Sequence, residues 1–268
     1  MDYEFEIEHF QTLDSTSSYL QRSLQSPSGS LDPGIWHVCS AGFQTAGRGQ
    51  RGNSWTSGAG ENLLFSILFH PCEIPASGQF VLTEIFSLAM VDFFSQQGVE
   101  VLIKWPNDIY AGSRKICGML FENSLSDGLV STSIVGIGVN LNQTDFGTSI
   151  ANPTSLAIET GKTADRNQSL SELLVMLRAR YENFANGAVS REALHAEYLS
   201  KLFRYGEFHK FQKLAAGPDP LNVSYANSTF ENVFEARISN VKENGLLVLE
   251  NRESRETEFA FKEVKFLL

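Results

Sequence analysis

The loop from Phe43 to Trp55 restricts the fold and the chemistry of this chain more than any other stretch. It has the sequence F-Q-T-A-G-R-G-Q-R-G-N-S-W and lies between two apolar runs of strand-like composition, residues 35–39 and 62–69. Its glycines let the backbone approach a ligand closely, and its arginines offer planar, charged donor groups to phosphate or carboxylate. The sequence therefore predicts a strand–loop–strand unit that encloses an anionic ligand.

The spacing of Gly47, Gly49 and Gly52 also matches G-x-G-x-x-G, the fingerprint of dinucleotide-binding folds. That fingerprint requires a helix that opens at the third glycine. Here the residues N-S-W-T-S-G-A-G follow, and they cannot begin a helix. The match therefore predicts no Rossmann unit. An exposed, mobile loop is the simple alternative that the rest of the sequence has to exclude.

Length, composition and charge limit the classes of protein to which this chain can belong. A length of 268 residues suits one large domain or a large and a small one, and a hydrophobic content of 42% is enough for an ordinary core. The formal net charge of −10 argues against nucleic acid as a partner. The 3 cysteines lack metal-ligand spacing, which indicates free thiols in a reducing cytoplasm. The acidic N-terminus is unlike a signal peptide and no apolar run has the length of a membrane span, so we expect a cytoplasmic protein.

Periodicity and capping signals predict strands and helices together in the larger, N-terminal part of the chain. Strands are expected at residues 3–10, 35–40, 62–70, 99–104, 109–110, 116–122 and 129–140, and helices after a cap at Asp14, Ser15 or Thr16 and at residues 80–94, 156–159, 170–184 and 191–199. After Tyr205-Gly206 the pattern changes to short strands at residues 208–214, 233–238, 246–250 and 257–261. We therefore predict an α+β domain of residues 1–207 and a small all-β domain of residues 208–268.

A second polar stretch indicates that the glycine loop belongs to a binding site and is not simply an exposed loop. Polar and charged residues gather around one bend of the chain and the hairpin after it: Lys104, Asn107, Asp108, Arg114 and Lys115. Ammonium groups beside a carboxylate suit a phosphate with Mg²⁺, although an exposed, charged hairpin tip would show the same residues. Lys104 continues an apolar strand, which argues against a solvated tip, and Gly136 and Gly138 indicate a close approach within another strand. No P-loop, G-x-S-x-G or metal-ligand spacing of histidines occurs, so we expect catalysis by charge placement without a nucleophilic side chain.

Taken together, four motifs resemble those of the biotin protein ligases. They are S-T-S at residues 15–17, G-R-G-Q-R-G-N-S-W at residues 47–55, K-W-P-N-D-I at residues 104–109 and G-I-G-V-N-L-N at residues 136–142. The resemblance covers nearly the whole chain. It implies an α+β fold, a mixed β-sheet with helices similar to class II aminoacyl-tRNA synthetases, followed by a small SH3-like β-barrel. Because the chain begins directly with the first strand of that fold, it resembles the monofunctional class without an N-terminal DNA-binding domain.

The resemblance implies a two-step reaction. Biotin and ATP would form biotinyl-5′-AMP with release of pyrophosphate, and Mg²⁺ would accompany the ATP. A lysine of a biotin carboxyl carrier domain of a carboxylase would then take the biotinyl group. Neither DNA nor a membrane would take part, and a homodimer is among the assemblies that the resemblance allows.

The resemblance also assigns roles to residues through the motifs that carry them. Biotin would be bound by Ser15, Thr16, Ser17, Gln44, Arg48, Gly49, Gln50, Lys115 and Gly118. The nucleotide would be bound by Arg48, Arg51, Trp55, Lys104, Asn107, Lys115 and Asn140. Catalysis would depend on Lys115, Arg48, Asp108 and Asn107, with Asp108 as a ligand for Mg²⁺.

Gln50 departs from the family pattern, since many members have an arginine there that helps to retain the reactive adenylate. A neutral glutamine predicts weaker retention unless Arg51 takes over the contact. Two other functions stay open. A lipoate–protein ligase shares the fold and the chemistry but lacks this pairing of motifs. A biotin-responsive regulator without catalysis is disfavoured by the net charge and by the presence of Lys115 and Asp108.

Overall fold

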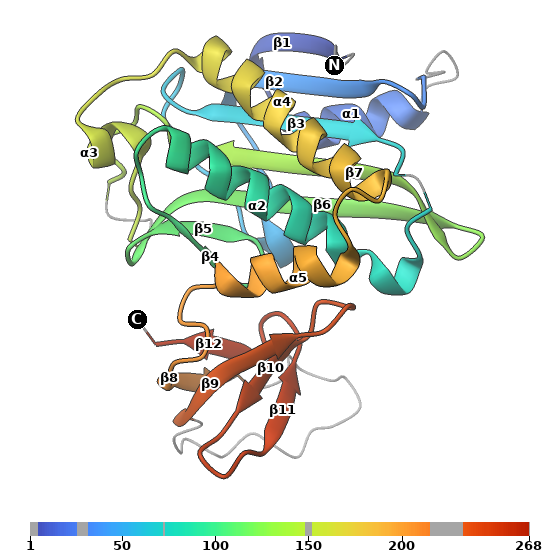
Figure 1. The fold of residues 1–268 in the computed structure, drawn as a ribbon. Helices are drawn as coiled ribbons and strands as arrows, with labels where there is room; N and C mark the ends of the chain where they lie inside the picture. The colour runs from blue at the N-terminus through green and yellow to red at the C-terminus, as the bar shows by residue number, and fades with distance from the viewer. Residues whose placement is uncertain (1–4, 26–31, 72, 148–151, 215–232, 268) are drawn as a thin grey trace, which may run out of the picture.

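The structure, a computed structural model, describes residues 5–25, 32–71, 73–147, 152–214 and 233–267. Two β-sheets organise it, one of seven strands in the order β1-β2-β3-β7-β6-β5-β4 and one of five strands in the order β11-β10-β9-β8-β12 (Figure 1). In chain order, the elements are β1 (Phe5–Leu13), α1 (Thr16–Gln25), β2 (Trp36–Gln44), η1 (Gln50–Gly52), β3 (Leu63–Phe69), η2 (Ala76–Gly78), α2 (Phe80–Gln96), β4 (Leu102–Lys104), β5 (Asp108–Ala111), β6 (Arg114–Ser126), β7 (Leu129–Val139), α3 (Leu156–Thr160), α4 (Arg166–Ala185), α5 (Arg191–Ser200), β8 (His209–Lys213), β9 (Val233–Val241), β10 (Leu247–Glu250), β11 (Glu256–Phe259) and β12 (Val264–Phe266).

The seven-stranded sheet is antiparallel except at its edge, where β1 runs parallel to β2. Strand β3 has the sequence L-L-F-S-I-L-F and is buried at every position. A run of apolar residues on both sides of a strand is typical of a central strand with both faces covered. This run therefore fixes β3 in the interior of the sheet, between β2 and β7.

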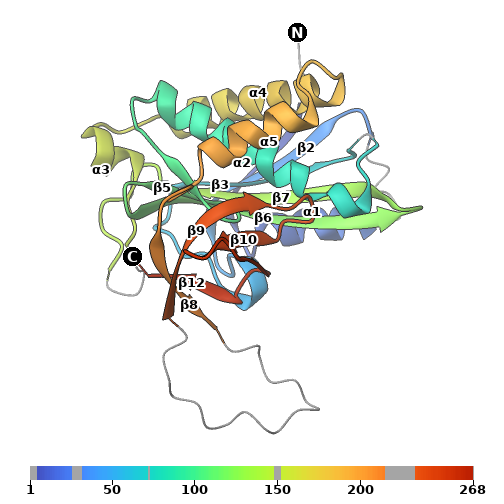
Figure 2. The same ribbon diagram turned by 60° about the horizontal axis from the view of Figure 1, so that its bottom comes forward.

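Helices α2, α4 and α5 cover one face of this sheet, and α1 lies on the opposite face (Figures 1 and 2). Helix α2 is apolar around its circumference because it packs between the sheet and the other two helices. Trp36 anchors this core, with its ring centroid 4.7 Å from that of Phe69 and 5.9 Å from that of Phe86. By length and hydropathy, residues 76–96 could cross a membrane, which the sequence analysis does not predict. Because 78% of an 18-residue apolar stretch within this segment is buried inside the protein, α2 is a core helix.

The face of the sheet under α1 carries a smaller apolar cluster. Leu20 of α1 packs there on Cys39, Leu68 and Ile134. Burial raises the pKa of the Cys39 thiol to about 12 and also raises that of Cys117, so both are inert free thiols, as predicted. The third cysteine, at position 72, lies outside the described residues. Beyond this cluster, the same face of the sheet forms the floor of a cavity.

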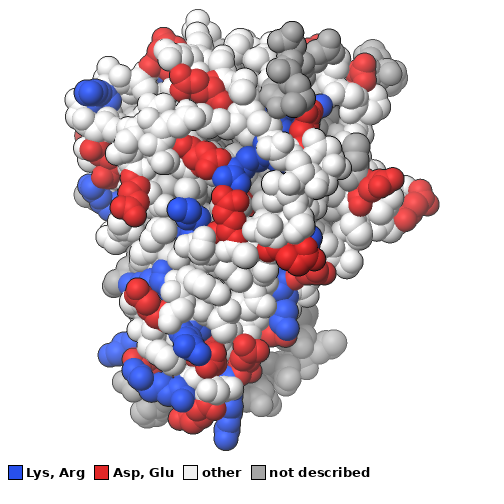
Figure 3. Space-filling model, in the orientation of Figure 1, with Lys and Arg blue, Asp and Glu red and all other residues white. Residues whose placement is uncertain are grey.

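Charged groups of both signs are interspersed on the face formed by α2, α4 and α5 (Figure 3). Arg180 of α4, for example, pairs with Asp92 of α2 and lies 2.8 Å from Glu197 of α5. These pairs hold the three helices together at the surface. Among the described residues of this face, no broad basic patch of the kind that binds nucleic acid is present.

The five-stranded sheet packs against the turn that follows β4. The indole Nε1 of Trp105 donates to the backbone oxygen of Gly245 at 3.0 Å. The ring of Trp105 also meets that of Phe261 edge-on, with 6.1 Å between the ring centroids. Both contacts come from loops between strands of the small sheet. The small sheet therefore fixes the turn that carries Asn107 and leads into β5.

The structure confirms the predicted α+β fold class and most of the predicted elements. Strand β4 begins at Leu102 because residues 99–101 lead out of α2 before the chain joins the sheet. The last predicted strand ends at Phe259, since Phe261 leaves the sheet to meet Trp105. Strand β12 is not predicted by the sequence, because three residues give too short a pattern.

Two further expectations have different outcomes. Only the short helix η1 follows in the glycine loop, and Asn53 after it is extended, so no helix opens at Gly52 and the dinucleotide-binding match is excluded. The boundary between two domains at residue 207 stays a prediction, although the chain passes from α5 to the second sheet there. The first two residues of the strand expected at 3–10 lie outside the described residues.

A substitution at Gly245 can show how tightly the small sheet packs against the rest of the protein. Its φ is 86°, and a Cβ at this position would lie 2.6 Å from Phe80 Cδ2. We expect Gly245→Ala to lower the free energy of unfolding by about 2–4 kcal/mol, of which about 1 kcal/mol comes from backbone strain and the rest from the clash. Chemical denaturation measures the loss.

Gly187 provides the matched control for this substitution. Its φ of 77° imposes a similar strain on alanine, but a Cβ there would meet nothing within 4 Å. Gly187→Ala should therefore cost only about 1 kcal/mol. Equal losses in the two variants would show that the contact between Gly245 and Phe80 is loose.

Candidate active site

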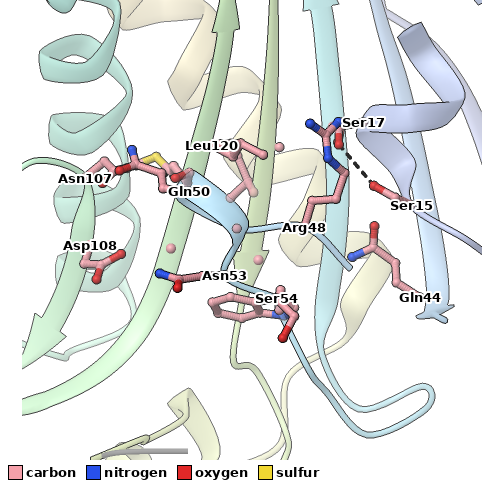
Figure 4. A pocket seen from close by; sticks show the side chains of 18 of the residues that line it. Ser15, Ser17, Gln44, Arg48, Gln50, Asn53, Ser54, Asn107, Asp108 and Leu120 are labelled. Atoms are coloured by element: carbon pink, nitrogen blue, oxygen red, sulfur yellow. Dashed lines mark hydrogen bonds between the residues drawn. The ribbon is translucent and has the colours of Figure 1, made fainter. Parts of the chain in front are cut away.

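A cavity of about 790 Å³ opens on the face of the large sheet that also carries α1, and its volume is typical of a small-molecule site. Strands β3, β6 and β7 form its floor, the start of α1 and the turn before β5 form its walls, and the loop of residues 44–56 covers it (Figure 4). Phe261 of the small sheet also lines it. Segments that are far apart in the sequence therefore meet at one site.

One end of the cavity is lined mainly by hydroxyl and amide groups. Ser15 and Ser17 lie side by side at the start of α1, with 3.1 Å between their Oγ atoms (Figure 4). Oε1 of Gln44 accepts from the backbone N–H of Thr16 at 2.8 Å and from its hydroxyl at 3.2 Å. Because this oxygen is occupied, the amide nitrogen of Gln44 is left to donate to a ligand. This end can therefore bind a ring that has both hydrogen-bond donors and acceptors.

Capping interactions place the start of α1 at this end. Oγ of Ser15 caps the helix by accepting from the backbone N–H of Ser18 at 3.5 Å, and Asp14 accepts from the backbone N–H of Ser15 at 2.8 Å. A hydrogen bond from Arg22 then lowers the pKa of the Asp14 carboxyl to about 2. Ser66 of β3 lies 2.7 Å from the hydroxyl of Thr16 and ties the helix start to the cavity floor. The polar end is thus fixed both by the chain around it and by the sheet beneath it.

The other end of the cavity, across the loop, is charged (Figure 4). Lys115 Nζ lies 2.7 Å from Asp108 Oδ1 and 5.6 Å from the centroid of the Trp55 ring. The β5–β6 hairpin brings the two charged residues together, and the backbone N–H of Lys115 is fixed by the backbone oxygen of Asn152 at 2.7 Å. An ammonium group with one carboxylate partner keeps further N–H donors for an anionic ligand.

Asn107 and Asn140 line the cavity and also hold its framework. Nδ2 of Asn107 donates to the backbone oxygen of Met119. Nδ2 of Asn140 donates to the backbone oxygen of Thr154 at 2.9 Å. Nδ2 of Asn140 also reaches the backbone oxygen of Lys115 at 3.5 Å, so its Oδ1 is the atom left for a ligand, whereas Asn107 keeps Oδ1 and one N–H.

Trp55 lies on a floor of glycines. Gly118 and Gly138 are opposite each other on β6 and β7. A Cβ at Gly138 would lie 2.5 Å from Trp55 Cε2, and one at Gly118 would lie 3.0 Å from Trp55 Cζ3. Gly136, on the same face of β7, leaves more room, since a Cβ there would meet Ser66 Oγ at 3.5 Å. The missing side chains let the loop close directly over the sheet, as the glycines of the predicted strand indicate.

The structure brings most of the residues predicted for the site into one cavity. Those that line it are Ser15, Thr16, Ser17, Gln44, Arg48, Gly49, Gln50, Trp55, Asn107, Asp108, Lys115, Gly118 and Asn140. Lys104 does not belong to this described lining. Its Nζ lies 3.1 Å from Tyr110 Oη and 5.6 Å from the ring centroid of Phe266, and burial lowers its pKa. The side chain of Arg51 lies outside the described part of the chain, and the ligand contacts of all these residues stay predictions.

Several residues that line the cavity are missing from the predicted site, among them Ser66, Leu120 and Phe261. Ser66 carries a signal, because it is a single serine within the apolar run of residues 62–69. Leu120 resembles any other apolar strand residue. Phe261 belongs to the other sheet, so only the tertiary structure places it at the site.

Known proteins resemble this chain in sequence and in fold. Residues 10–140 match the model of the biotin/lipoate A/B protein ligase family. The chain is 32% identical to the bifunctional ligase/repressor BirA of Escherichia coli (strain K12) over 198 residues, which are 73% of this chain and 58% of that protein. The chain belongs to the biotin/lipoate A/B protein ligase family.

Two further members extend the comparison. The biotin--[acetyl-CoA-carboxylase] ligase of Mycobacterium tuberculosis is 28% identical over 192 residues, which are 70% of this chain and 68% of that ligase. The structure of the biotin protein ligase of Aquifex aeolicus with biotin and ATP is similar with a TM-score of 0.73, at 24% identity, over 98% of this chain and 99% of that one. This likeness confirms the fold. The chain spans only 54% and 58% of the length of two BirA relatives that it matches.

The glycine floor leads to a prediction about Trp55. Gly138→Ala should drive the Trp55 ring off the floor, because the new Cβ would lie 2.5 Å from Cε2 of that ring. Trp36 and Trp105 stay buried, so acrylamide should quench the tryptophan fluorescence of the variant more strongly than that of the wild type.

Gly136→Ala is the control for this experiment. Its Cβ would make ordinary contacts, 3.5 Å from Ser66 Oγ and 3.8 Å from the Cβ atoms of Leu120 and Ser17. It should leave the quenching unchanged. The same quenching in both variants would contradict the position of Trp55 on the floor.

Proposed function

We propose that the protein joins biotin to a lysine of a biotin carboxyl carrier domain, with ATP as the energy source and biotinyl-5′-AMP as the intermediate. One observation carries this proposal: an end lined by hydroxyl and amide groups and an ammonium–carboxylate pair open into the same cavity. The polar end suits the ring of biotin, whose ureido group has N–H donors and a carbonyl acceptor. The carboxylate of biotin would then point to the charged end, where it meets the α-phosphate of ATP.

In the first step, an oxygen of the biotin carboxylate attacks the α-phosphorus of ATP. The bond from that phosphorus to the bridging oxygen breaks, and pyrophosphate leaves with the bonding electrons. Two anions have to approach each other, so the protein acts mainly by neutralising and orienting charge. Lys115 does this with the N–H donors that Asp108 leaves unused, while Asp108 holds the ammonium in place.

In the second step, the uncharged amine of the carrier lysine attacks the acyl carbon of biotinyl-5′-AMP. The bond from that carbon to the phosphate oxygen breaks and AMP leaves. The nitrogen then loses a proton, and the product is an amide. Because negative charge grows on the same phosphate as AMP leaves, Lys115 serves both steps.

Mg²⁺ fits the site as a companion of ATP. The described residues contain no group of three or more His, Cys, Asp or Glu side chains that could hold a metal ion by themselves. Mg²⁺ is commonly held by one or two carboxylates together with substrate phosphates. Asp108 is the one carboxylate in the described lining of the cavity, and it would serve as that ligand. The ion would supply neutralisation of phosphate charge.

The polar end favours biotin over lipoate. The dithiolane ring of lipoate has two sulfur atoms and neither an N–H nor a carbonyl group. It would offer no partner to the amide nitrogen of Gln44 or to the hydrogen-bonding capacity that Ser15 and Ser17 do not use on each other, at a cost of about 1–3 kcal/mol for each polar group left unpaired. The protein should therefore ligate biotin and discriminate against lipoate.

A regulatory function is a separate matter. The Escherichia coli relative is a bifunctional ligase/repressor, of which this chain spans 58%. Lys115 and Asp108 equip the cavity for turnover, so the proposal is for a ligase. Independence of DNA and membranes, a homodimer and a cytoplasmic location stay predictions from the sequence.

Two measurements test the proposed function. The protein mixed with ATP, Mg²⁺ and biotin should release pyrophosphate. When a carrier domain is added, mass spectrometry should show the gain of one biotinyl group. Lipoate in place of biotin should give neither product. A protein that binds biotin and releases no pyrophosphate would be a regulator without ligase activity.

Lys115 is the residue whose loss should affect the first step most. Lys115→Ala should slow single-turnover formation of biotinyl-5′-AMP by about 10²–10³-fold, as the loss of one preorganised donor does. Lys115→Arg should not restore the rate, since a planar fork replaces a point charge. The control is Arg114→Ala, because Arg114 pairs with Glu159 and lies outside the described lining. A near-normal rate in the Lys115→Ala variant would refute the assignment.

Gln50 should set how firmly the intermediate is retained. It lines the cavity at the edge of the covering loop (Figure 4). An arginine there would add a charge-assisted hydrogen bond, stronger than that of a neutral glutamine by about 1.4 kcal/mol, which is about tenfold in an equilibrium constant. Gln50→Arg should therefore slow the dissociation of labelled biotinyl-5′-AMP about tenfold. Equal dissociation rates would show that position 50 does not touch the adenylate.

A further inference from the structure

Arg48, at the start of the covering loop, is held in a fixed direction by two side chains. Its Nη2 lies 2.6 Å from Glu122 Oε1 and its Nη1 lies 3.1 Å from Glu122 Oε2, so the ion pair is bidentate. Nη1 also donates to Oε1 of Gln21 at 3.3 Å. The guanidinium group therefore links the loop to β6 on one side and to α1 on the other.

Glu122 lies on the cavity face of β6. Side chains alternate along a strand, so Glu122 is on the same face as Gly118 and Leu120, both of which line the cavity. It follows them along β6 and reaches Arg48 from the rim. Figure 4 shows Arg48 beside Ser17, at the polar end of the site.

This arrangement leaves one edge of Arg48 for a ligand. A guanidinium group has five N–H donors in a planar fork. Glu122 takes one donor from each terminal nitrogen, and Gln21 takes the second donor of Nη1. Nε and the second hydrogen of Nη2 have no partner among the described residues. They lie on one edge of the fork, with the spacing that binds two oxygens of one anion.

We propose that Glu122 is a positioning residue for the intermediate. Together with Gln21 it holds Arg48 so that the Nε–Nη2 edge stays free to bind the phosphate of biotinyl-5′-AMP. This inference rests on the proposed function. A side chain that is already oriented loses less conformational freedom when the ligand binds. Glu122 therefore slows the release of the adenylate without touching it.

The opposite role for Glu122 has the opposite consequence. A carboxylate that competes with the adenylate for Arg48, or that repels its phosphate through space, would weaken retention. Removal of its charge would then slow the release of the adenylate. If Glu122 orients Arg48, removal of its charge speeds the release. The sign of the change therefore separates the two roles.

The deciding measurement is the dissociation of a non-hydrolysable biotinyl-sulfamoyl adenylate in stopped-flow displacement. Glu122→Gln should speed dissociation about three- to tenfold, because a neutral amide replaces a charge-assisted, partly exposed pair. In an Arg48→Ala background the same substitution should have no effect, since its action passes through the arginine. Unchanged or slower dissociation from Glu122→Gln would overturn the proposal, and so would equal effects in both backgrounds.

The matched control is Glu250→Gln in the small sheet. Glu250 also forms a bidentate pair, with Arg237, and the exposed side-chain fractions of 15% and 41% resemble the 22% and 39% of Glu122 and Arg48. Glu250→Gln should leave the dissociation rate unchanged, and thermal unfolding verifies that each variant is folded. Glu122→Asp keeps the charge but is too short to reach both nitrogens, so it should also speed dissociation. Wild-type dissociation from this variant would contradict the proposal.

Pyrophosphate release separates the two ways in which these ideas can fail. If the wild type releases no pyrophosphate and does not bind the analogue, the proposed function is wrong and the role of Glu122 falls with it. If the wild type forms the adenylate and Glu122→Gln retains the analogue as firmly, only the role of Glu122 is wrong.

Discussion

The site depends on the absence of side chains at Gly118, Gly136 and Gly138. Strands β6 and β7 pair in the interior of the large sheet, where strand residues normally fill the face with branched or aromatic groups. A glycine in such a place gives up packing and adds freedom to the unfolded chain, at about 0.5–1 kcal/mol for each residue. The space that it leaves lets Trp55 lie against the backbone, directly beside the ammonium of Lys115. The loss of stability is thus confined to the place where the site needs room.

Interactions on the opposite face of the large sheet and with the small sheet offset this loss of stability. Glu84 of α2 is fully buried, pairs with Arg191 and lies 2.8 Å from Nδ1 of His195. Nε2 of His195 lies 3.0 Å from Oδ1 of Asn240 in β9. A buried carboxylate needs such partners, because one that loses its partner costs several kcal/mol. The network that satisfies Glu84 therefore also ties α2 and α5 to the small sheet and steadies the turn at Trp105.

Local patterns predict this fold well wherever the deciding interaction is itself local. Gly98, with a φ of 77°, follows α2 as its expected end, and Gly245 forms the expected turn between β9 and β10. Contacts between distant segments leave no such pattern, so neither Glu122 nor Phe261 stands out in the sequence. Lys104 shows the limit best: it is the first residue of the K-W-P-N-D-I motif, yet the strand directs its side chain to Tyr110 and Phe266. The residue types of the site can be predicted from motifs, whereas the direction of each side chain requires the sheet.

Under the proposed function, Lys115 and Arg48, the two cations in the described lining of the cavity, suit different tasks because their charges differ in shape. During the reaction, negative charge moves from a carboxylate to a phosphate and on to a leaving group. A compact cation suits this task, because the ammonium of Lys115 can rotate its N–H donors toward each of these groups in turn. Retention of a finished intermediate needs a planar partner of fixed direction, which the fork of Arg48 provides. Asp108 holds the first cation and Glu122 the second, and each leaves N–H donors unused. The two acidic residues therefore leave the site its positive charge and determine the direction in which the free N–H donors of the lysine and the arginine point. Preorganisation of the site accordingly resides in its carboxylates as much as in the lysine and the arginine that a motif makes visible.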